Sequence, residues 1–198
     1  MVLLNKKKFR LTSPMPPSVN HYLGYRAVPK KKKGRTVYIV VPYLTKEARD
    51  YKEMFSKYAI KQVKEQGWDI EKTRNRHYYM DCVYYFPRID MDEQNYPKCM
   101  SDALNGIAYI DDNFILTRTN RIYYDKKNPR IELEISEVDY MGIFDNEKEL
   151  IEFENKCKTC TRHKRNCSIL KKAKEGRIQE EIDESKNCNK FSRIKKER

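Results

Sequence analysis

One segment near the middle of the chain constrains the fold most, because a run of aromatic residues is followed at once by acids. Residues 78–86 are rich in tyrosine and phenylalanine, which is typical of a buried strand. The strand ends at a proline, and Asp90 and Asp92 lie just beyond it. A short helix is predicted at 96–106, with two further aspartates at 111–112. The pattern therefore predicts acidic side chains on loops that rigid elements hold in place.

These acids stand out because the chain as a whole is strongly basic. Its 198 residues include 42 Lys and Arg against 29 Asp and Glu, a formal net charge of +13. A polycation has no electrostatic reason to gather acids, unless they hold a divalent cation against a polyanion. Carboxylate oxygens suit Mg²⁺ or Mn²⁺, and such an ion can generate a nucleophile beside a phosphate. These features favour metal-dependent cleavage of nucleic acid.

A calcium-binding EF-hand loop is the obvious alternative for this acidic stretch, and the sequence excludes it. If Asp90 is the first position of the loop, Asn95 occupies the sixth position, where the motif needs glycine. Ser101 occupies the twelfth position, where the motif needs glutamate.

The composition also bears on where the protein works. No stretch approaches the roughly 18 apolar residues of a membrane span, and the first apolar run is too short for a signal peptide. We therefore expect a soluble cytoplasmic protein, bacterial or phage-encoded, with no membrane partner. In a reducing compartment its 6 cysteines favour metal binding or free thiols over disulfides.

Hydrophobic periodicity and turn residues predict the other elements. They are strands at 8–12 and 37–41, a helix at 46–66 between Thr45 as N-cap and Gly67, a hairpin of strands 114–124 and 130–138, and a helix at 146–156 capped by Asp145. The basic run at 30–35 is predicted to be a mobile loop. Together the elements predict an α+β fold in which a mixed β-sheet packs against helices.

Several motifs resemble the RusA family of Holliday junction resolvases. They are Pro16-Pro17-Ser18-x-Asn20-x-Tyr22, then Asp90-x-Asp92 with Asn95 and Lys98, then Asp102-Ala-Leu-Asn-Gly-Ile followed by Asp111-Asp112. The motifs occur in the family's order and at similar separations across residues 9–138. The family places Asn directly after the second aspartate, whereas Glu93-Gln94 intervene here. Asn95 and Lys98 therefore lie two positions later than the family pattern.

The resemblance implies a homodimeric, Mg²⁺-dependent endonuclease that cuts four-way DNA junctions symmetrically, with its RusA-like domain at 1–144. By the resemblance, Asp90, Asp92 and Asp112 bind the metal and are catalytic, and Lys98 is the essential lysine. Physical chemistry agrees, because clustered carboxylates stay ionised when a cation compensates them. A nearby lysine stabilises charge that develops on the phosphate.

Three further residues would support this site. Asp102 lies one helical turn after Lys98 and would hold its ammonium in place, although an ordinary surface ion pair is the alternative. Of the adjacent pair, the resemblance favours Asp112 as the ligand, which leaves Asp111 a supporting or capping role. Asn95 is the third supporting residue.

The remaining segment, 145–198, is predicted to be a helical, basic appendage. Between 156 and 198 it has 15 basic and 6 acidic residues, a net charge of +9. Its four cysteines suit a structural Zn²⁺ site formed by Cys157, Cys160, Cys167 and Cys188. An iron–sulfur cluster, four reduced thiols, or His163 in place of one thiolate remain alternatives. The aliphatic spacing at 170, 178 and 182 predicts a helix packed over the metal.

Cationic residues in both parts are expected to contact the DNA backbone. They are Lys30, Lys31, Lys32, Lys33, Arg35, Arg162, Lys164 and Arg165. Two other functions compete with junction resolution. One is a nuclease that acts on flaps, forks or duplex DNA, and the other is a junction-binding protein without catalysis. The acids and Lys98 argue against a pure binder, because acids that face phosphates hinder binding.

Overall fold

A computed structural model describes residues 7–74, 76–163 and 165–194 of the chain. It divides into two compact units, Met1–Glu137 and Val138–Arg198, which are described separately below. This boundary lies earlier in the chain than the expected division between residues 144 and 145. Met141, Ile143 and Phe144 belong to the hydrophobic core of the second unit, so the linker must precede them.

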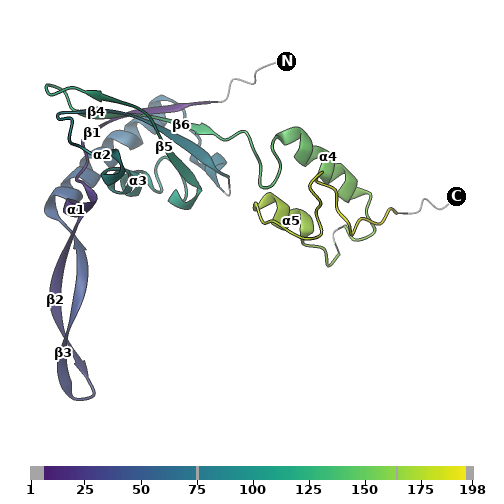
Figure 1. Ribbon diagram of the computed structural model, residues 1–198, viewed down its shortest axis with the longest axis horizontal. Coiled ribbons are helices and arrows are strands. Elements are labelled where there is room, and N and C mark those ends of the chain that lie inside the picture. The colour runs from purple at the N-terminus through teal and green to yellow at the C-terminus, as the bar shows by residue number, and fades with distance from the viewer. Residues whose placement is uncertain (1–6, 75, 164, 195–198) are drawn as a thin grey trace. The chain divides into compact units, whose positions relative to one another are not determined.

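The first unit is built on a four-stranded mixed sheet (Figure 1). The strands are β1 (Phe9–Pro14), β6 (Arg130–Glu137), β4 (Tyr78–Phe86) and β5 (Ile115–Tyr124), in that order across the sheet. β6 runs antiparallel to both β1 and β4, whereas β4 and β5 are parallel. The expected α+β fold with a mixed sheet is confirmed.

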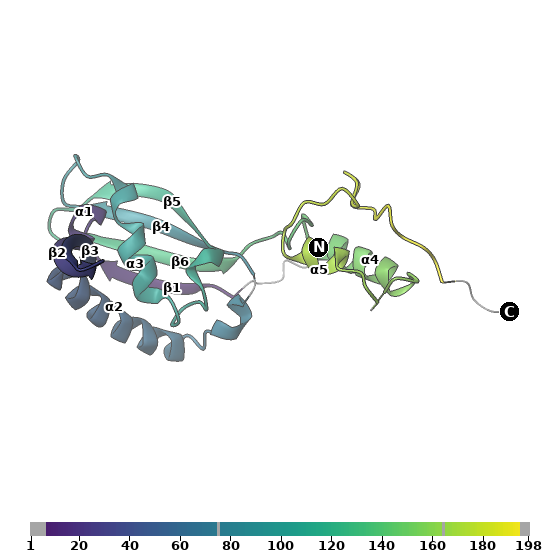
Figure 2. The ribbon, with the colours of Figure 1, turned by 90° about the horizontal axis from the view of Figure 1, so that it is seen from below.

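Helices α2 (Lys46–Glu65) and α3 (Pro97–Leu104) cover one face of the sheet (Figure 2). α2 begins where Thr45 Oγ1 accepts a hydrogen bond from the Ala48 N–H at 3.2 Å, and it stops before Gly67, which has a φ of +57°. Tyr51 and Phe55 on its inner face are buried in the same hydrophobic core as the inward side chains of β4. The predicted helix and both of its end signals are confirmed.

The predicted hairpin of β5 and β6 is wrong, although both strands exist. β4 lies between them and pairs with each. Alternating polarity identifies a strand but does not choose its neighbour. β4 pairs along both edges, which makes it a central strand, and it buries every second side chain from Tyr78 to Phe86.

The basic run at 30–35 is not a loop between short strands. β2 (Leu23–Lys32) and β3 (Arg35–Leu44) continue to its end and form a separate two-stranded sheet, called the β-arm below. Lys33 and Gly34 have φ values of +47° and +74°, as a two-residue type I′ turn requires. The β-arm follows α1 (Val19–Tyr22), and Figure 1 shows it projecting beyond that helix.

The second unit contains α4 (Glu147–Lys158) and α5 (Ile169–Lys174) around a small core. Asn146, and not Asp145, caps α4, because Asn146 Oδ1 accepts from the Glu149 N–H at 3.0 Å. Gly142 brings the backbone close to α5: a Cβ there would lie 2.1 Å from the Ala173 carbonyl oxygen.

The helix expected to run from 170 to 182 is also wrong. α5 ends at Lys174, and Gly176 with a φ of +76° turns the chain away. Ile178 is 89% exposed and packs on nothing that would require a longer helix. Within the described part of the chain, no helix has the length and apolar character needed to cross a bilayer.

Candidate active site

The loop after β4 carries the first two aspartates. Asp90 Oδ1 lies 3.2 Å from Arg88 Nε, and the Asp90 side chain is 68% exposed. Asp92 caps a short 3₁₀ turn, η2 (Glu93–Asn95), by accepting from the Gln94 N–H at 3.0 Å. Both carboxylates also contribute to raising the pKa of the buried Tyr96 hydroxyl, after burial itself. The loop therefore presents two carboxylates at the surface beside Tyr96.

A second cluster joins α3 to the loop that precedes β5. Lys98 Nζ lies 2.7 Å from Asp102 Oδ1, one helical turn along α3. The same ammonium lies 3.5 Å from Asp112 Oδ2, at the start of a 3₁₀ turn, η3 (Asp112–Phe114). The structure thus brings together three of the predicted site residues from two separate segments. We call Lys98, Asp102 and Asp112 the acid–lysine cluster.

Tyr22 from α1 completes the support of this cluster. Its hydroxyl donates a hydrogen bond to Asp102 Oδ2, so Lys98 and Tyr22 hold the two oxygens of one carboxylate. Partial burial would raise the pKa of Asp102, but the hydrogen bonds from Lys98 and Tyr22 outweigh burial and lower it. The bond to Asp102 in turn raises the pKa of Lys98, and Asp112 adds to this effect. Lys98 is therefore held as an ammonium in a fixed position.

The other two supporting residues occupy short turns. Asp111 caps η3 by accepting from the Asn113 N–H at 2.9 Å, so it has the capping role and Asp112 is left to face Lys98. Asn95 lies at the end of η2, where its N–H donates to the Asp92 carbonyl at 3.3 Å. The two inserted residues, Glu93 and Gln94, form the rest of this turn.

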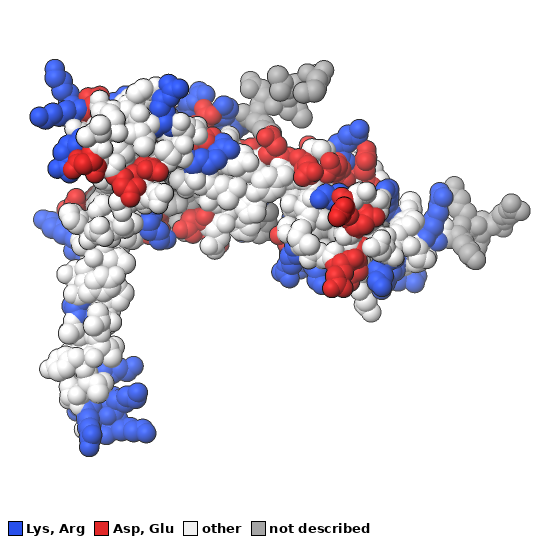
Figure 3. Space-filling model, in the orientation of Figure 1, with Lys and Arg blue, Asp and Glu red and all other residues white. Residues whose placement is uncertain are grey.

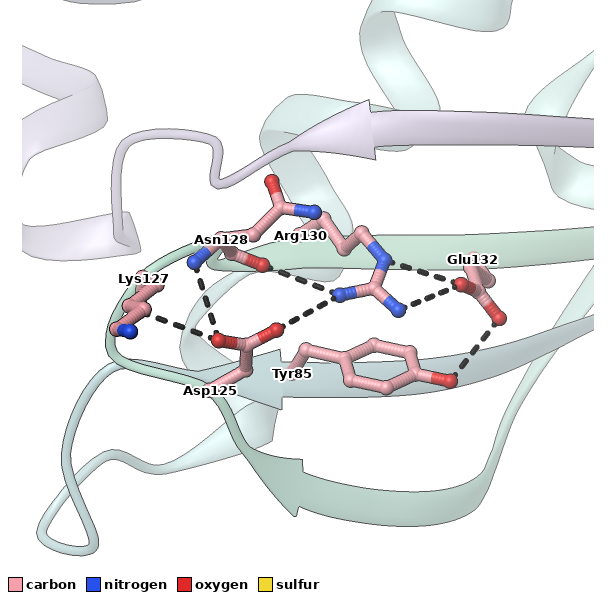
Figure 4. A network of polar contacts seen from close by, with 6 residues as sticks. All are labelled: Tyr85, Asp125, Lys127, Asn128, Arg130 and Glu132. Carbon is pink, nitrogen blue, oxygen red and sulfur yellow. Dashed lines mark hydrogen bonds and ion pairs between the residues drawn. The ribbon is translucent and has the colours of Figure 1, made fainter.

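A polar network braces the end of β4 from which the acidic loop departs (Figure 4). The Arg130 guanidinium lies 3.5 Å from the centre of the Tyr85 ring and bonds both Asp125 and Glu132. The Asp125 N–H donates to the carbonyl of Phe86, the last residue of β4, at 2.7 Å. These contacts fix the strand end only a few residues before Asp90.

The donor chemistry of the three aspartates fits a magnesium ion, which prefers hard carboxylate oxygens. The positions of their side chains, however, do not form a complete metal site. Within the described ranges, no three His, Cys, Asp or Glu side chains are grouped so that they could hold a metal ion. The statement applies to the four cysteines as well, so the side-chain placement gives no support to a zinc-bound appendage.

Comparison with sequence models of known families identifies the family of this chain. The sequence model of the family described as Endodeoxyribonuclease RusA matches residues 24–136. The chain belongs to the RusA family. The match includes Asp90, Asp92, Lys98 and Asp112 and ends just before the second unit begins. A search among curated proteins found no match.

The cationic residues predicted to contact DNA lie in two places. Lys30 to Lys33 and Arg35 form the tip of the β-arm, inside the RusA match. Arg162 and Arg165 are exposed in the turn after α4, outside the match. Lys164 lies outside the described residues.

The predicted zinc ligands lie in the second unit. Cys157 is in the last turn of α4, and Cys160 follows it in a turn closed by a 3.0 Å bond from the Cys160 N–H to the Cys157 carbonyl. Cys157 and Cys188 pack against the same small core, whereas Cys167 is exposed. Cys82 and Cys99 are buried in the core of the first unit.

Sequence reasoning missed two contributors to the site. Tyr22 belonged to the first motif, yet nothing in its spacing revealed a bond to Asp102, some eighty residues away. Arg130 had no signal either, because arginines on an alternating strand are common. Both act through contacts between distant segments, which only the folded chain shows.

Proposed function

We propose that this RusA-family protein is a divalent-cation-dependent endonuclease that resolves four-way DNA junctions by paired symmetric incisions. The proposal extends to homodimeric action and to a role in DNA recombination and repair. The observation that carries it is the acid–lysine cluster, in which Asp112 and Lys98 meet from separate segments within the RusA match.

The residues of the cluster have distinct roles in this proposal. Lys98 stabilises negative charge on the phosphate under attack or on the leaving oxygen. Asp102 and Tyr22 position Lys98 and keep it protonated. Asp90, Asp92 and Asp112 would hold the Mg²⁺ or Mn²⁺ ion, which when bound would activate water and neutralise phosphate charge.

Paired incision requires two active sites related by two-fold symmetry. A homodimer with one self-complementary interface supplies them, which is the reason to include it in the proposal. Flap or fork cleavage, and binding without catalysis, are the competing functions. The charge that Lys98 carries beside Asp112 favours chemistry over binding alone.

The test is cleavage of a synthetic mobile four-way junction with and without Mg²⁺, beside a linear duplex and a flap of equal length. Paired nicks at symmetry-related positions only with Mg²⁺ are the expected result. Cation-independent retention without cutting would identify a binding protein. Equal cutting of the duplex or the flap would identify a different nuclease.

For the second unit, a structural zinc ion held by Cys157, Cys160, Cys167 and Cys188 stays a prediction. Burial, and after it the nearby Cys188, Cys167 and Cys160 thiols, raise the pKa of the Cys157 thiol to about 11. The Ser192 N–H also donates to Cys160 Sγ at 3.5 Å. A bound metal supplies on the order of 10 kcal/mol of folding free energy, which a unit with so small a core needs.

Elemental analysis of protein purified without chelator tests the zinc prediction. One equivalent of zinc per chain is expected. Less than half an equivalent, or a brown iron-bearing sample, would overturn it.

A further inference from the structure

The β-arm is the largest feature of the first unit that the proposed chemistry does not use. β2 and β3 pair over ten rungs, from Leu23 opposite Leu44 to Lys32 opposite Arg35. They hydrogen-bond to no strand of the main sheet. Most side chains of the β-arm are exposed, in contrast to β1, β4 and β6 of the main sheet, in which buried side chains alternate with more exposed ones.

One face of the β-arm is uncharged along most of its length. Directly paired residues share a face, and successive rungs alternate between faces. The uncharged face therefore carries three consecutive pairs: Tyr25 with Pro42, Ala27 with Val40, and Pro29 with Tyr38. Tyr25, Val40 and Tyr38 are 67%, 70% and 73% exposed. We call these three pairs the aromatic face.

The tip of the β-arm is cationic. Lys30, Lys31, Lys32, Lys33 and Arg35 surround a two-residue turn, and none forms an ion pair with another described residue. Lys32 and Arg35 lie directly opposite each other, a like-charge pair that destabilises a ribbon in water. Figure 3 shows the blue side chains gathered at the tip and an almost uncharged surface along the rest of the β-arm, residues 23–29 and 38–44, which we call the shaft. Such a tip favours a polyanion as its partner.

The shaft also needs a partner, because an isolated two-stranded ribbon is at best marginally stable in water. Pro29 and Pro42 lack the N–H that strand addition would use, so pairing with a further β-strand is disfavoured. Exposed aromatic rings beside cations match a different ligand, since bases stack on such rings while cations hold the phosphates.

The length of the β-arm bears on which DNA structure it fits, a continuous duplex or a branch point. Ten residues at about 3.3 Å each span about 33 Å. A major groove is only about 8.5 Å deep, so an arm that enters DNA with its tip first reaches well beyond the groove. Where duplexes meet, the base stack is interrupted and the faces of the last base pairs become available to aromatic side chains.

We propose that the β-arm enters the branch point of junction DNA, where Tyr25 and Tyr38 stack on exposed base pairs and the cationic tip holds phosphates. The inference rests on the proposed function and adds a source for its selectivity. The acid–lysine cluster cuts any phosphodiester presented to it, whereas the aromatic face distinguishes a branch from continuous duplex.

The decisive variant is Tyr25→Ala with Tyr38→Ala, and Tyr25→Phe with Tyr38→Phe is its matched control. Affinity is measured for a four-way junction and for a linear duplex of equal length at one salt concentration. The alanine variant should bind the junction at least about tenfold more weakly, since stacking is lost, and should bind the duplex as the wild type does. The phenylalanine variant should retain junction affinity, because both rings remain.

A spectroscopic readout tests stacking directly, while the retained duplex affinity shows that the alanine variant is folded. 2-Aminopurine placed next to the branch should change its fluorescence when wild type or the phenylalanine variant binds, and should not respond to the alanine variant. Replacing Lys30 and Lys31 by Gln leaves the shaft intact and should make the slope of log K against log[salt] less negative by about 1.8, at about 0.9 per phosphate.

Three results would overturn the inference. The first is an alanine variant whose junction affinity is unchanged, and the second is 2-aminopurine that does not respond to wild type. The third is a wild-type dimer that the alanine change converts to monomers while each chain keeps its junction affinity. The last would assign the aromatic face to a second copy of the chain. If wild type cuts junctions in Mg²⁺ and any of these occurs, only the arm inference fails; if wild type neither binds nor cuts junctions, the proposed function fails.

Discussion

The two units of this chain differ in what holds them together. The first buries a continuous core in which the sheet, α2 and α3 take part, from Phe9 in β1 to Ile135 in β6. The second has a small core cluster whose buried members are Phe144, Leu150, Phe153 and Ala173. The RusA match ends where the large core ends.

This difference indicates that the first unit holds the reaction centre and that the second unit has an accessory role. A rigid sheet and α3 hold Lys98 against Asp102 and Asp112, and precise placement of that kind is what catalysis needs. The second unit buries few side chains, and the net charge of +9 on its residues 156–198 suits an added DNA contact better than a reaction centre. We therefore expect changes around Lys98 to affect cutting, and changes in the second unit to affect binding without abolishing cutting.

The largest effect should come from the aspartates. Asp90→Asn or Asp112→Asn should lower the cleavage rate at least about 100-fold, because a lost ligand costs no less than a lost supporting contact around a metal. Junction binding should be unchanged or tighter, since a negative charge that faces phosphate is removed. Cleavage and gel-shift assays on one protein preparation test this. Loss of binding in step with cutting would make these residues structural.

A matched pair of core variants sharpens the comparison. Phe55→Ala should destabilise the first unit by about 3–5 kcal/mol and lower cleavage, whereas Phe153→Ala should unfold the second unit and leave Mg²⁺-dependent cutting in place. Thermal melting followed by near-UV circular dichroism, with cleavage assays alongside, measures both. Equal loss of cutting in the two variants would show that the units act as one.

Asp102→Asn should have a smaller effect with a distinctive pH dependence. In the folded protein the bond to Asp102 raises the pKa of Lys98, so the ammonium persists to higher pH than in the unfolded chain. Without that carboxylate, Lys98 should lose its proton at lower pH, and the alkaline limb of the pH–rate profile should move to lower pH. Cleavage at saturating DNA should fall about tenfold. A uniform loss at every pH would mean that Asp102 only supports the fold.

The smallest effect concerns salt. Contacts with about six phosphates would give log K a slope near −5 against log[salt], at about 0.9 per phosphate. Truncation after residue 155 should make the slope less negative, since residues 156–198 carry a net charge of +9. Fluorescence anisotropy over a salt series measures it. An unchanged slope would mean that this segment does not contact DNA.

How far the sequence predicted the molecule depended on whether the signal was local. The α2 helix was predictable because Thr45, the buried stripe and Gly67 all lie within one segment. The pairing of Lys98 with Asp102 was predictable because one helical turn separates them. The central position of β4, the bond from Tyr22 to Asp102 and the bracing by Arg130 join distant segments, so no local pattern revealed them.

The most direct measurement is cleavage of a four-way junction in Mg²⁺ by a chain that ends at Glu137, beside the same chain with Asp112→Asn. The account predicts paired nicks at the same positions as with the full chain, and none from the Asp112→Asn form. Cutting that requires residues beyond Glu137, or that survives Asp112→Asn, would contradict it.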